Sequence, residues 1–219
     1  MDRVSLRLDL HVHTRQSADA LSSIDEINGR CRGLSMDGYA ICDHDTTAGI
    51  PEAVSSANEL VVIPGVEVSA KGAHILCIDP SEPVPSHLSI VETVERIRAQ
   101  GAVAILAHPY GIPRSYVRYA DVRGVGFDAV ETANSAQAPF ETVLGWNRTL
   151  AGRLGLPETG GSDSHIPETF GRSFTVVESV SREPEDVIKA IREGRTRAFG
   201  SGTGLGERLA KIWRLREKP

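Results

Sequence analysis

The feature that most constrains the fold is a repeated alternation between short apolar runs and amphipathic stretches. The apolar runs are often β-branched and are bounded by Gly or Pro, which is typical of strands. They lie at 5–13, 38–42, 60–67, 73–78, 103–107, 128–132, 156–160 and 174–177. Helix-like stretches occupy 22–32, 51–58, 87–100, 140–153, 184–193 and 208–216. This alternation predicts parallel strands covered by helices.

The number of these units indicates the architecture. Seven or eight of them in 219 residues favour a closed or nearly closed barrel over a long open sheet. The fold class is therefore α/β, and in barrels of this class the chemistry lies at the C-terminal ends of the strands. We expect one domain over 1–219, with its core at about 5–200 and a C-terminal loop and helix at 201–219.

Polar residues that could bind metals fall at the predicted strand ends. The chain has seven histidines, and His11 and His13 share one face of the first strand because side chains alternate there. The other candidates at or near strand ends are His44, Glu67, His74, His108, Asp163 and His165. Histidines that only fill a core would not gather at strand ends in this way. The pattern predicts a metal site.

The types of donor atom limit which metals could bind and which chemistry they could support. Imidazole and carboxylate without thiolate suit Zn²⁺, Mn²⁺ or Fe²⁺, and the sequence does not choose among them. Clustered divalent ions polarise a phosphoryl oxygen and lower the pKa of a water molecule towards ~7, so no Ser or Cys nucleophile is required. Cys42, near the site, is expected to be a small buried residue. Asp9 and Asp43 are candidates to orient the imidazoles, with a strand-end salt bridge as the alternative for Asp9.

The order of the motifs resembles that of a known family. HxH at 11–13, CDH at 42–44, GVE at 65–67, an isolated His74, AHP at 107–109 and GSDSH at 161–165 resemble the PHP (polymerase and histidinol phosphatase) family over about residues 8–177. The resemblance implies a distorted (β/α)7 TIM-like barrel and a trinuclear metal site that hydrolyses phosphate esters. Carried over by position, the metal ligands are His11, His13, Asp19, His44, Glu67, His74, His108, Asp163 and His165.

The resemblance also implies how these ligands divide among the metals. Glu67 bridges two ions, and one of the two shells is completed by His11, His13 and Asp163. His74 and His108 hold the second ion with Glu67. A third ion falls to Asp19, His44 and His165. The predicted catalytic residues are Glu67, Asp163, His165 and Asp19.

Asp19 decides between two and three divalent ions. Some family members carry His at this position, and HTRQSAD at 13–19 departs from the commoner HTxxSDG. If Asp19 is a solvated loop residue, the resemblance implies a site with two ions.

Arginine is the available phosphate binder, because the chain has only four lysines among its 24 basic residues. Three arginines lie on loops expected to overlook the site: Arg15, Arg114 and Arg172. We predict that they contact the substrate, Arg114 and Arg172 above all.

Three alternatives compete with a PHP-type phosphatase. Residues 43–47 match the DxDxT signature of haloacid-dehalogenase-type phosphatases, but lysines are sparse and no downstream acidic pair follows. A nuclease or phosphodiesterase acting on nucleic-acid ends or short oligonucleotides is an alternative, although a net charge of −5 argues against long nucleic acid. The third alternative is a non-catalytic metal-binding regulatory module, which nine competent ligand positions disfavour.

The sequence thus predicts a metal-dependent phosphoesterase. Its expected substrate is a small phosphorylated metabolite or nucleotide, attacked by a metal-bridging hydroxide. No apolar run approaches the roughly 20 residues of a membrane helix. The first residues lack a signal-peptide core, and three cysteines without CxxC spacing favour reduced thiols, so we expect a cytoplasmic location.

Overall fold

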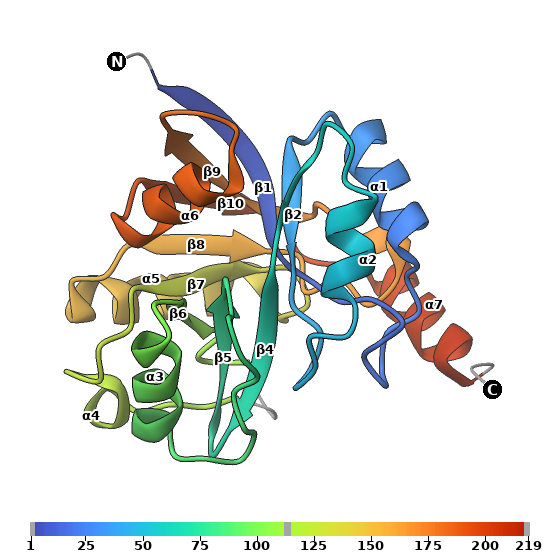
Figure 1. Cartoon of the computed structure of the whole chain (residues 1–219). Helices are drawn as coiled ribbons and strands as arrows, with labels where there is room; N and C mark the ends of the chain where they lie inside the picture. The colour runs from blue at the N-terminus through green and yellow to red at the C-terminus, as the bar shows by residue number, and fades with distance from the viewer. Residues whose placement is uncertain (1–2, 112–114, 217–219) are drawn as a thin grey trace.

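The computed structural model describes residues 3–111 and 115–216, which form two five-stranded sheets (Figure 1). The strands of the first sheet follow the order β10-β9-β1-β2-β3. Their bounds are Thr196–Gly200 (β10), Ser173–Ser179 (β9), Val4–Val12 (β1), Gly38–Ile41 (β2) and Val61–Ile63 (β3). The second sheet has the order β4-β5-β6-β7-β8. The strands of this sheet span Gly65–Ala70 (β4), Ala73–Ile78 (β5), Val103–Ala107 (β6), Ala129–Asn134 (β7) and Glu158–Gly161 (β8).

Both sheets are mixed, so the prediction of uniformly parallel strands is wrong for two strands. β5 runs antiparallel to β4 and β6, and β9 runs antiparallel to β1 and β10. Only Lys71 and Gly72 separate β4 from β5, and a parallel pair would need a crossover of about a dozen residues. Because β5 is reversed, His74 near its start pairs with Ala107 at the end of β6.

The α/β class is confirmed, whereas the closed (β/α)7 barrel stays a prediction. Within residues 3–111 and 115–216, the two sheets meet through two isolated bridges, Val12–Ser164 and His44–Glu67. The predicted strand at 60–67 is divided at Pro64 into β3 and β4, since proline cannot donate to a ladder. β10 was not predicted from the sequence.

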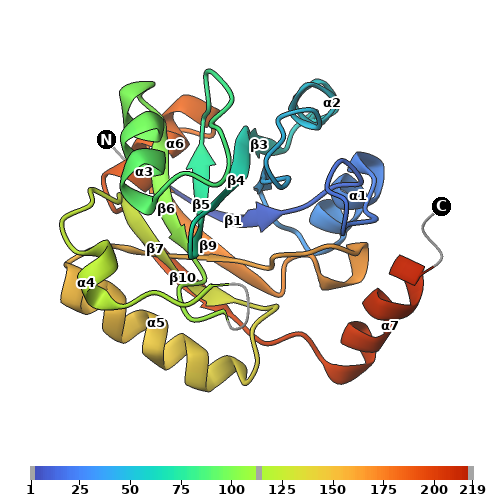
Figure 2. The same cartoon turned by 90° about the horizontal axis from the view of Figure 1, so that it is seen from below.

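Helices connect the strands and lie around them (Figure 2). Their bounds are Ile24–Gly33 (α1), Ile50–Ser55 (α2), Ile90–Ala99 (α3), Tyr119–Val122 (α4), Phe140–Leu154 (α5), Pro184–Arg192 (α6) and Leu205–Arg216 (α7). The six predicted helices are all present with shifted ends, and α4 is an addition. Capping boxes at Ser23 and Ser89 begin α1 and α3. Nothing in the described part of the chain is a helix long and apolar enough to span a membrane.

β1 carries buried apolar and buried polar side chains. Leu6, Leu8 and Leu10 belong to the cluster that also contains apolar residues of α6. Asp9 and His11 alternate with these leucines and are also fully buried. One face of β1 therefore stabilises the fold while the other brings polar side chains into the interior, where the site lies.

Candidate metal centre

Glu67 on β4 lies at the centre of a group of imidazoles. Its side chain is 1% exposed, and its two carboxylate oxygens face different histidines. Oε1 lies 2.8 Å from His74 Nδ1 and 2.9 Å from His108 Nε2. Oε2 lies 3.2 Å from His11 Nε2, 3.3 Å from His13 Nε2 and 3.1 Å from His44 Nδ1. One carboxylate thus contacts five histidines from four separate places in the chain, because His11 and His13 both lie at the end of β1.

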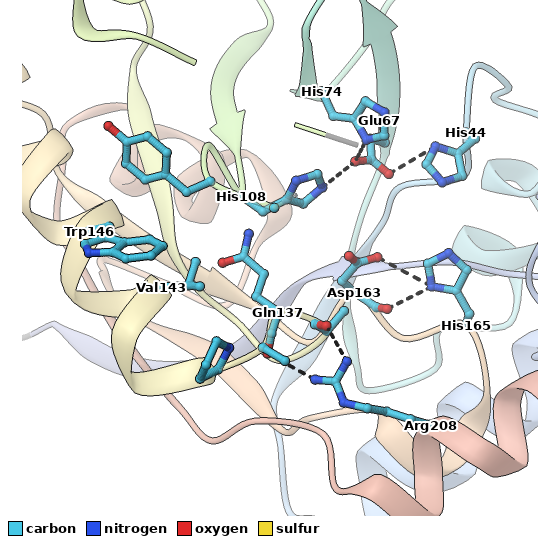
Figure 3. A pocket seen from close by; sticks show the side chains of 15 residues that line it. His44, Glu67, His74, His108, Gln137, Val143, Trp146, Asp163, His165 and Arg208 are labelled. Carbon is cyan, nitrogen blue, oxygen red and sulfur yellow. Dashed lines mark hydrogen bonds and ion pairs between the residues drawn. The ribbon is translucent and has the colours of Figure 1, made fainter. Parts of the chain in front are cut away.

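Asp163 and His165, which follow β8, extend the group on one side (Figure 3). Asp163 Oδ1 lies 3.2 Å from His13 Nε2. His165 Nε2 lies 3.1 Å from Asp19 Oδ2, and Asp19 Oδ1 lies 3.8 Å from His44 Nε2. The structure therefore brings together all nine residues that the resemblance implied as ligands.

The donor atoms fit divalent ions. Four subsets have ligand atoms within 4.8 Å of one another: His11, His13, Glu67 and Asp163; His44, Glu67 and His74; His13, His44 and His165; and His11, His108 and Glu131. His11 Nε2, His13 Nε2 and Glu67 Oε2 are buried and form no hydrogen bond with the residues described. Buried polar atoms normally have partners, so converging nitrogen and oxygen atoms without them match the requirements of a metal site.

Backbone conformation helps to aim two of these side chains. Asp163 has φ 53° and His108 has φ 27°, both in a region that non-glycine residues seldom adopt. His108 directly follows β6, and Asp163 follows β8 after one residue. Both amides are held, because Asp163 N donates to His11 O at 2.8 Å and His108 N donates to Glu131 Oε2 at 3.0 Å. Rare conformations of this kind cluster at functional sites, where surrounding contacts hold them in place.

Glu131 on β7 is a functional residue that our sequence analysis missed. Its Oε1 lies 2.9 Å from His11 Nδ1, and its side chain is 1% exposed. Oε2 accepts hydrogen bonds from His108 N and from Asn134 Nδ2, each at 3.0 Å. The signal was present, because Glu131 is an acidic residue inside an apolar predicted strand that ends near the other candidates.

Asp43 orients an imidazole, as predicted, but it does so through a serine. Its carboxylate accepts from Thr14 N and Thr14 Oγ1, both at 2.7 Å, and from Ser17 Oγ at 2.9 Å. Ser17 Oγ lies 3.3 Å from His13 Nδ1 and accepts from His44 N at 2.9 Å. Asp43 and Ser17 therefore tie the loop after β1 to the loop after β2.

Asp9 orients backbone rather than imidazole. Its carboxylate accepts from Ser162 N at 2.8 Å, Gly171 N at 2.9 Å and His11 N at 3.3 Å. Burial raises the pKa of Asp9 to about 6, against the opposing effect of these hydrogen bonds. Asp9 thus holds the loop that presents Asp163, and the predicted contact between Asp9 and a ligand imidazole is wrong.

Opposite charges stabilise each other throughout the cluster. Burial alone would raise the pKa of Glu67 and Asp163, but the neighbouring imidazoles, first that of His11, hold both pKa values well below their usual range. Burial would also lower the pKa of His13, yet the adjacent carboxylates of Asp163 and Glu67 raise it to about 9. For His44 burial dominates and lowers the pKa to about 4. Glu67 and Asp163 are therefore held as anions, which favours cation binding.

A cavity of about 550 Å³ opens beside this cluster. One side is formed by six of the nine candidate ligands: His44, Glu67, His74, His108, Asp163 and His165 (Figure 3). The opposite side is formed by side chains that our sequence analysis did not select, namely Tyr110, Gln137, Val143, Trp146 and Arg208. They come from the segments after β6 and β7 and from α5 and α7.

The predicted substrate-binding arginines are placed less favourably. Arg114 lies outside the described residues. Arg172 pairs with Glu207, with Nε 3.1 Å from Oε1, and Arg15 is exposed on the loop after β1; neither is among the described residues that line the cavity. Arg208 lines it instead, while its guanidinium donates to Ala136 O at 2.8 Å and Gln137 O at 3.0 Å. The roles of Arg15, Arg114 and Arg172 stay predictions.

Cys31, Cys42 and Cys77 are buried and unpaired. The predicted core role of Cys42 is confirmed, because it belongs to the apolar cluster around β1. Burial raises the pKa of all three thiols, which keeps them protonated and unreactive.

Comparison with known proteins agrees with this geometry. The family model for the PHP domain matches residues 9–120, and the model described as PHP-associated matches residues 147–196. A 5'-3' exoribonuclease from Haemophilus influenzae is 33% identical over 118 residues, which are 50% of this chain and 43% of that protein. A 3',5'-nucleoside bisphosphate phosphatase from Chromobacterium violaceum is 36% identical over 106 residues, which are 43% of this chain and 37% of that protein. The alignments span less than half the length of these two relatives.

A solved structure shows the same fold. It is a two-domain protein from Bacteroides vulgatus containing a predicted PHP-like metal-dependent phosphoesterase, with a TM-score of 0.71 and 18% sequence identity. The match covers 97% of this chain and 70% of that one. The PHP domain model accounts for half of the chain, and the resemblance predicted from the motifs is confirmed: the chain belongs to the PHP domain family.

Proposed function

We propose that this protein is a metal-dependent phosphoesterase that hydrolyses the ester of a small phosphorylated metabolite or nucleotide. The observation on which the proposal depends is the position of Glu67, whose two oxygens lie within 3.3 Å of nitrogen atoms of five histidines. A carboxylate shared in this way is suited to bridging two cations, and an accessible cavity lies directly beside it.

The nine ligand candidates would hold two or three divalent ions, Zn²⁺, Mn²⁺ or Fe²⁺. Glu67 would join a shell of His11, His13 and Asp163 to a second shell of His74 and His108. Asp19, His44 and His165 would form the third. We also propose that the two sheets act as a distorted barrel whose one end carries these residues.

The ions would polarise the phosphoryl oxygens and lower the pKa of water, so that hydroxide could attack the phosphorus without a protein nucleophile. The residues of the chain would position the ligand imidazoles and balance the charge of the ions. Glu131 and Asp43 restrict the imidazoles, and the anionic Glu67 and Asp163 balance the cations. In a two-ion site, the hydrogen-bonded pair of His165 and Asp19 could deliver a proton to the leaving alcohol oxygen.

Cleavage at nucleic-acid ends is the second candidate. It is favoured by the similarity to a 5'-3' exoribonuclease over half of the chain and by a cavity large enough for a nucleotide. A diester substrate would use the same metal centre, and only the group accepted in the cavity would differ. The nucleic-acid partner would still be a short oligonucleotide or a nucleic-acid end.

The test combines metal analysis with a substrate panel. The purified chain would be loaded with Zn²⁺, Mn²⁺ or Fe²⁺ and assayed on a nucleoside monophosphate, a nucleoside 3',5'-bisphosphate, glycerol phosphate, an aryl phosphodiester and a short oligonucleotide. We expect bound metal and hydrolysis of at least one ester. Glu67→Gln should abolish turnover and release metal, whereas Glu59→Gln, at an exposed position, should change neither. Metal-loaded protein that cleaves no ester would contradict the proposal.

A further inference from the structure

The side of the cavity that faces the metal centre has an apolar, aromatic surface. Trp146 on α5 is 50% exposed, although tryptophan is usually well buried. Its ring lies edge-on to Tyr110, with ring centroids 6.3 Å apart and planes at 85°. Val143, one helical turn earlier, completes the surface (Figure 3). A half-exposed indole held by a second ring is suited to stacking against a planar group.

Next to this surface lies an amide with a fixed orientation. Asn147 is fully buried, and its Nδ2 donates to Thr132 O at 3.0 Å and to Gln137 Oε1 at 3.1 Å. A backbone carbonyl can only accept, so Thr132 fixes which end of the Asn147 amide is the donor. Gln137 must then present its oxygen to Asn147, and its nitrogen points the other way.

Gln137 lines the cavity, and its side-chain nitrogen is buried and unpaired at the cavity wall. Gln137 is 8% exposed, and its Nε2 has no hydrogen-bond partner among the residues described. A Cβ atom at Gly111 would lie 2.9 Å from Gln137 Nε2 and 3.0 Å from His108 Nδ1, so the amide and the imidazole are separated by a space that only glycine leaves open. A buried donor without a partner costs free energy, which a ligand acceptor would recover.

We propose that Gln137 and Trp146 form a subsite for the alcohol part of the substrate, and that this part carries a planar heterocycle, as in a nucleoside phosphate. The ring would stack on Trp146, and an acceptor atom on the ring or its sugar would accept a hydrogen bond from Gln137 Nε2. Asn147 is a positioning residue that keeps the donor directed into the cavity. The inference rests on the proposed phosphoesterase function and specifies its substrate class.

Binding can be measured without turnover, because the chain has only two tryptophans. Trp213 on α7 is 63% exposed and does not line the cavity, so Trp213→Phe leaves Trp146 as the single indole reporter. We expect adenosine to quench its fluorescence saturably, and glycerol at the same concentrations to have no effect. Gln137→Met, which keeps the side-chain length but removes the donor, should weaken adenosine binding by about tenfold. The absence of saturable quenching, or equal affinity in Gln137→Met, would overturn the proposal.

Kinetics separates this inference from the proposed function. In the metal-loaded enzyme we compare kcat/KM for adenosine monophosphate with that for glycerol phosphate. Trp146→Ala and Gln137→Met should each lower the ratio of the two values by about tenfold, and Trp213→Ala should leave it unchanged. A ratio that stays constant in both cavity variants would refute the subsite while the phosphoesterase function stands. Wild-type enzyme inactive on every ester of the substrate panel would refute the function, and the fluorescence titration would still decide the subsite.

Discussion

The Nδ1 atom of His11 lies 2.9 Å from Oε1 of Glu131, and neither side chain is more than 1% exposed. A carboxylate at this distance favours a proton on Nδ1, so Nε2, which faces Glu67 and Asp163, is the nitrogen of His11 that would bind a metal. The other oxygen of Glu131 holds the amide of His108. One acidic residue on β7 therefore sets the geometry of two candidate ligands from β1 and β6.

Glu131→Gln should weaken metal binding without unfolding the protein. The amide keeps the shape of the side chain but loses the charge that raises the basicity of His11. We expect a decrease of about 10- to 100-fold in metal affinity, with a parallel loss of hydrolysis at limiting metal. A chelator-competition titration measures the affinity, and the exposed variant Glu141→Gln on α5 is the control. Wild-type affinity in Glu131→Gln would show that the contact plays no part in metal binding.

Metal affinity should rise with pH between about 6.5 and 9. The adjacent carboxylates of Asp163 and Glu67 raise the pKa of His13 to about 9 despite its burial, so a metal must displace its proton over this range. The folding stability of the metal-free protein depends on pH in the opposite direction. The stability gained from the protonated imidazole of His13 is complete below pH 6.5 and is lost as the pH rises through about 9.

Two measurements check this pH dependence. Calorimetric titrations in buffers of different ionisation enthalpy should show proton release on metal binding at pH 7.5. Thermal melts of the metal-free protein should show lower stability at pH 9 than at pH 7. His87→Ala, in an exposed turn before α3, should leave the proton release unchanged. Metal binding without proton release at pH 7.5 would contradict the prediction.

Removal of metal should lower the melting temperature substantially. A ligand that binds only the folded state at a thousandfold excess over its Kd stabilises that state by about 4 kcal/mol. For a chain of this size the corresponding change in Tm is about 10 °C. Differential scanning calorimetry with and without a chelator measures it, and Glu67→Gln should lose most of the difference. Identical melting curves with and without chelator would argue against a structural contribution of the ions.

Gly161→Ala should disrupt the contact between β8 and β1. A Cβ atom at Gly161 would lie 2.3 Å from His11 Cβ and 2.7 Å from His11 N, so one strand must move. We expect a loss of about 1–3 kcal/mol in stability, together with reduced metal content. Gly145→Ala in the middle of α5 is the matched control, because no atom lies within 4 Å of its added Cβ and alanine favours the helix. A Gly161→Ala protein as stable as the wild type would contradict the expected clash.

The fold could be predicted where local sequence determines it. The helices with Ser23 and Ser89 caps and the strand beginning near Leu6 follow from residue periodicity and capping, which are local properties. β10 could not be predicted in the same way. Its exposed residues, among them Arg197 and Phe199, lack a strand-like pattern, and pairing with β9 makes them a strand.

The candidate site likewise contains residues that local sequence identifies and residues that only long-range contacts identify. The His11 and His13 pair and the Asp163 and His165 pair are recognisable because two-residue spacing places their side chains on one side of the chain. Glu131, Gln137 and Arg208 have no such local pattern. Glu131 lies behind His11, and Gln137 and Arg208 line the cavity from the segment after β7 and from α7. Their importance depends on contacts with residues distant in sequence.

The chemistry of the site follows from the sequence, since eight imidazoles and carboxylates at or near strand ends can be recognised from residue type and spacing, and the resemblance to the PHP family adds Asp19. The surroundings of that chemistry depend on the tertiary structure: the reversed β5 brings His74 to Glu67, the carboxylate of Glu131 lies behind His11, and the Gln137 amide lies opposite them. The physical reason is that donor type is a property of a single residue. Orientation and partnership instead arise from packing between strands and helices that are far apart along the chain.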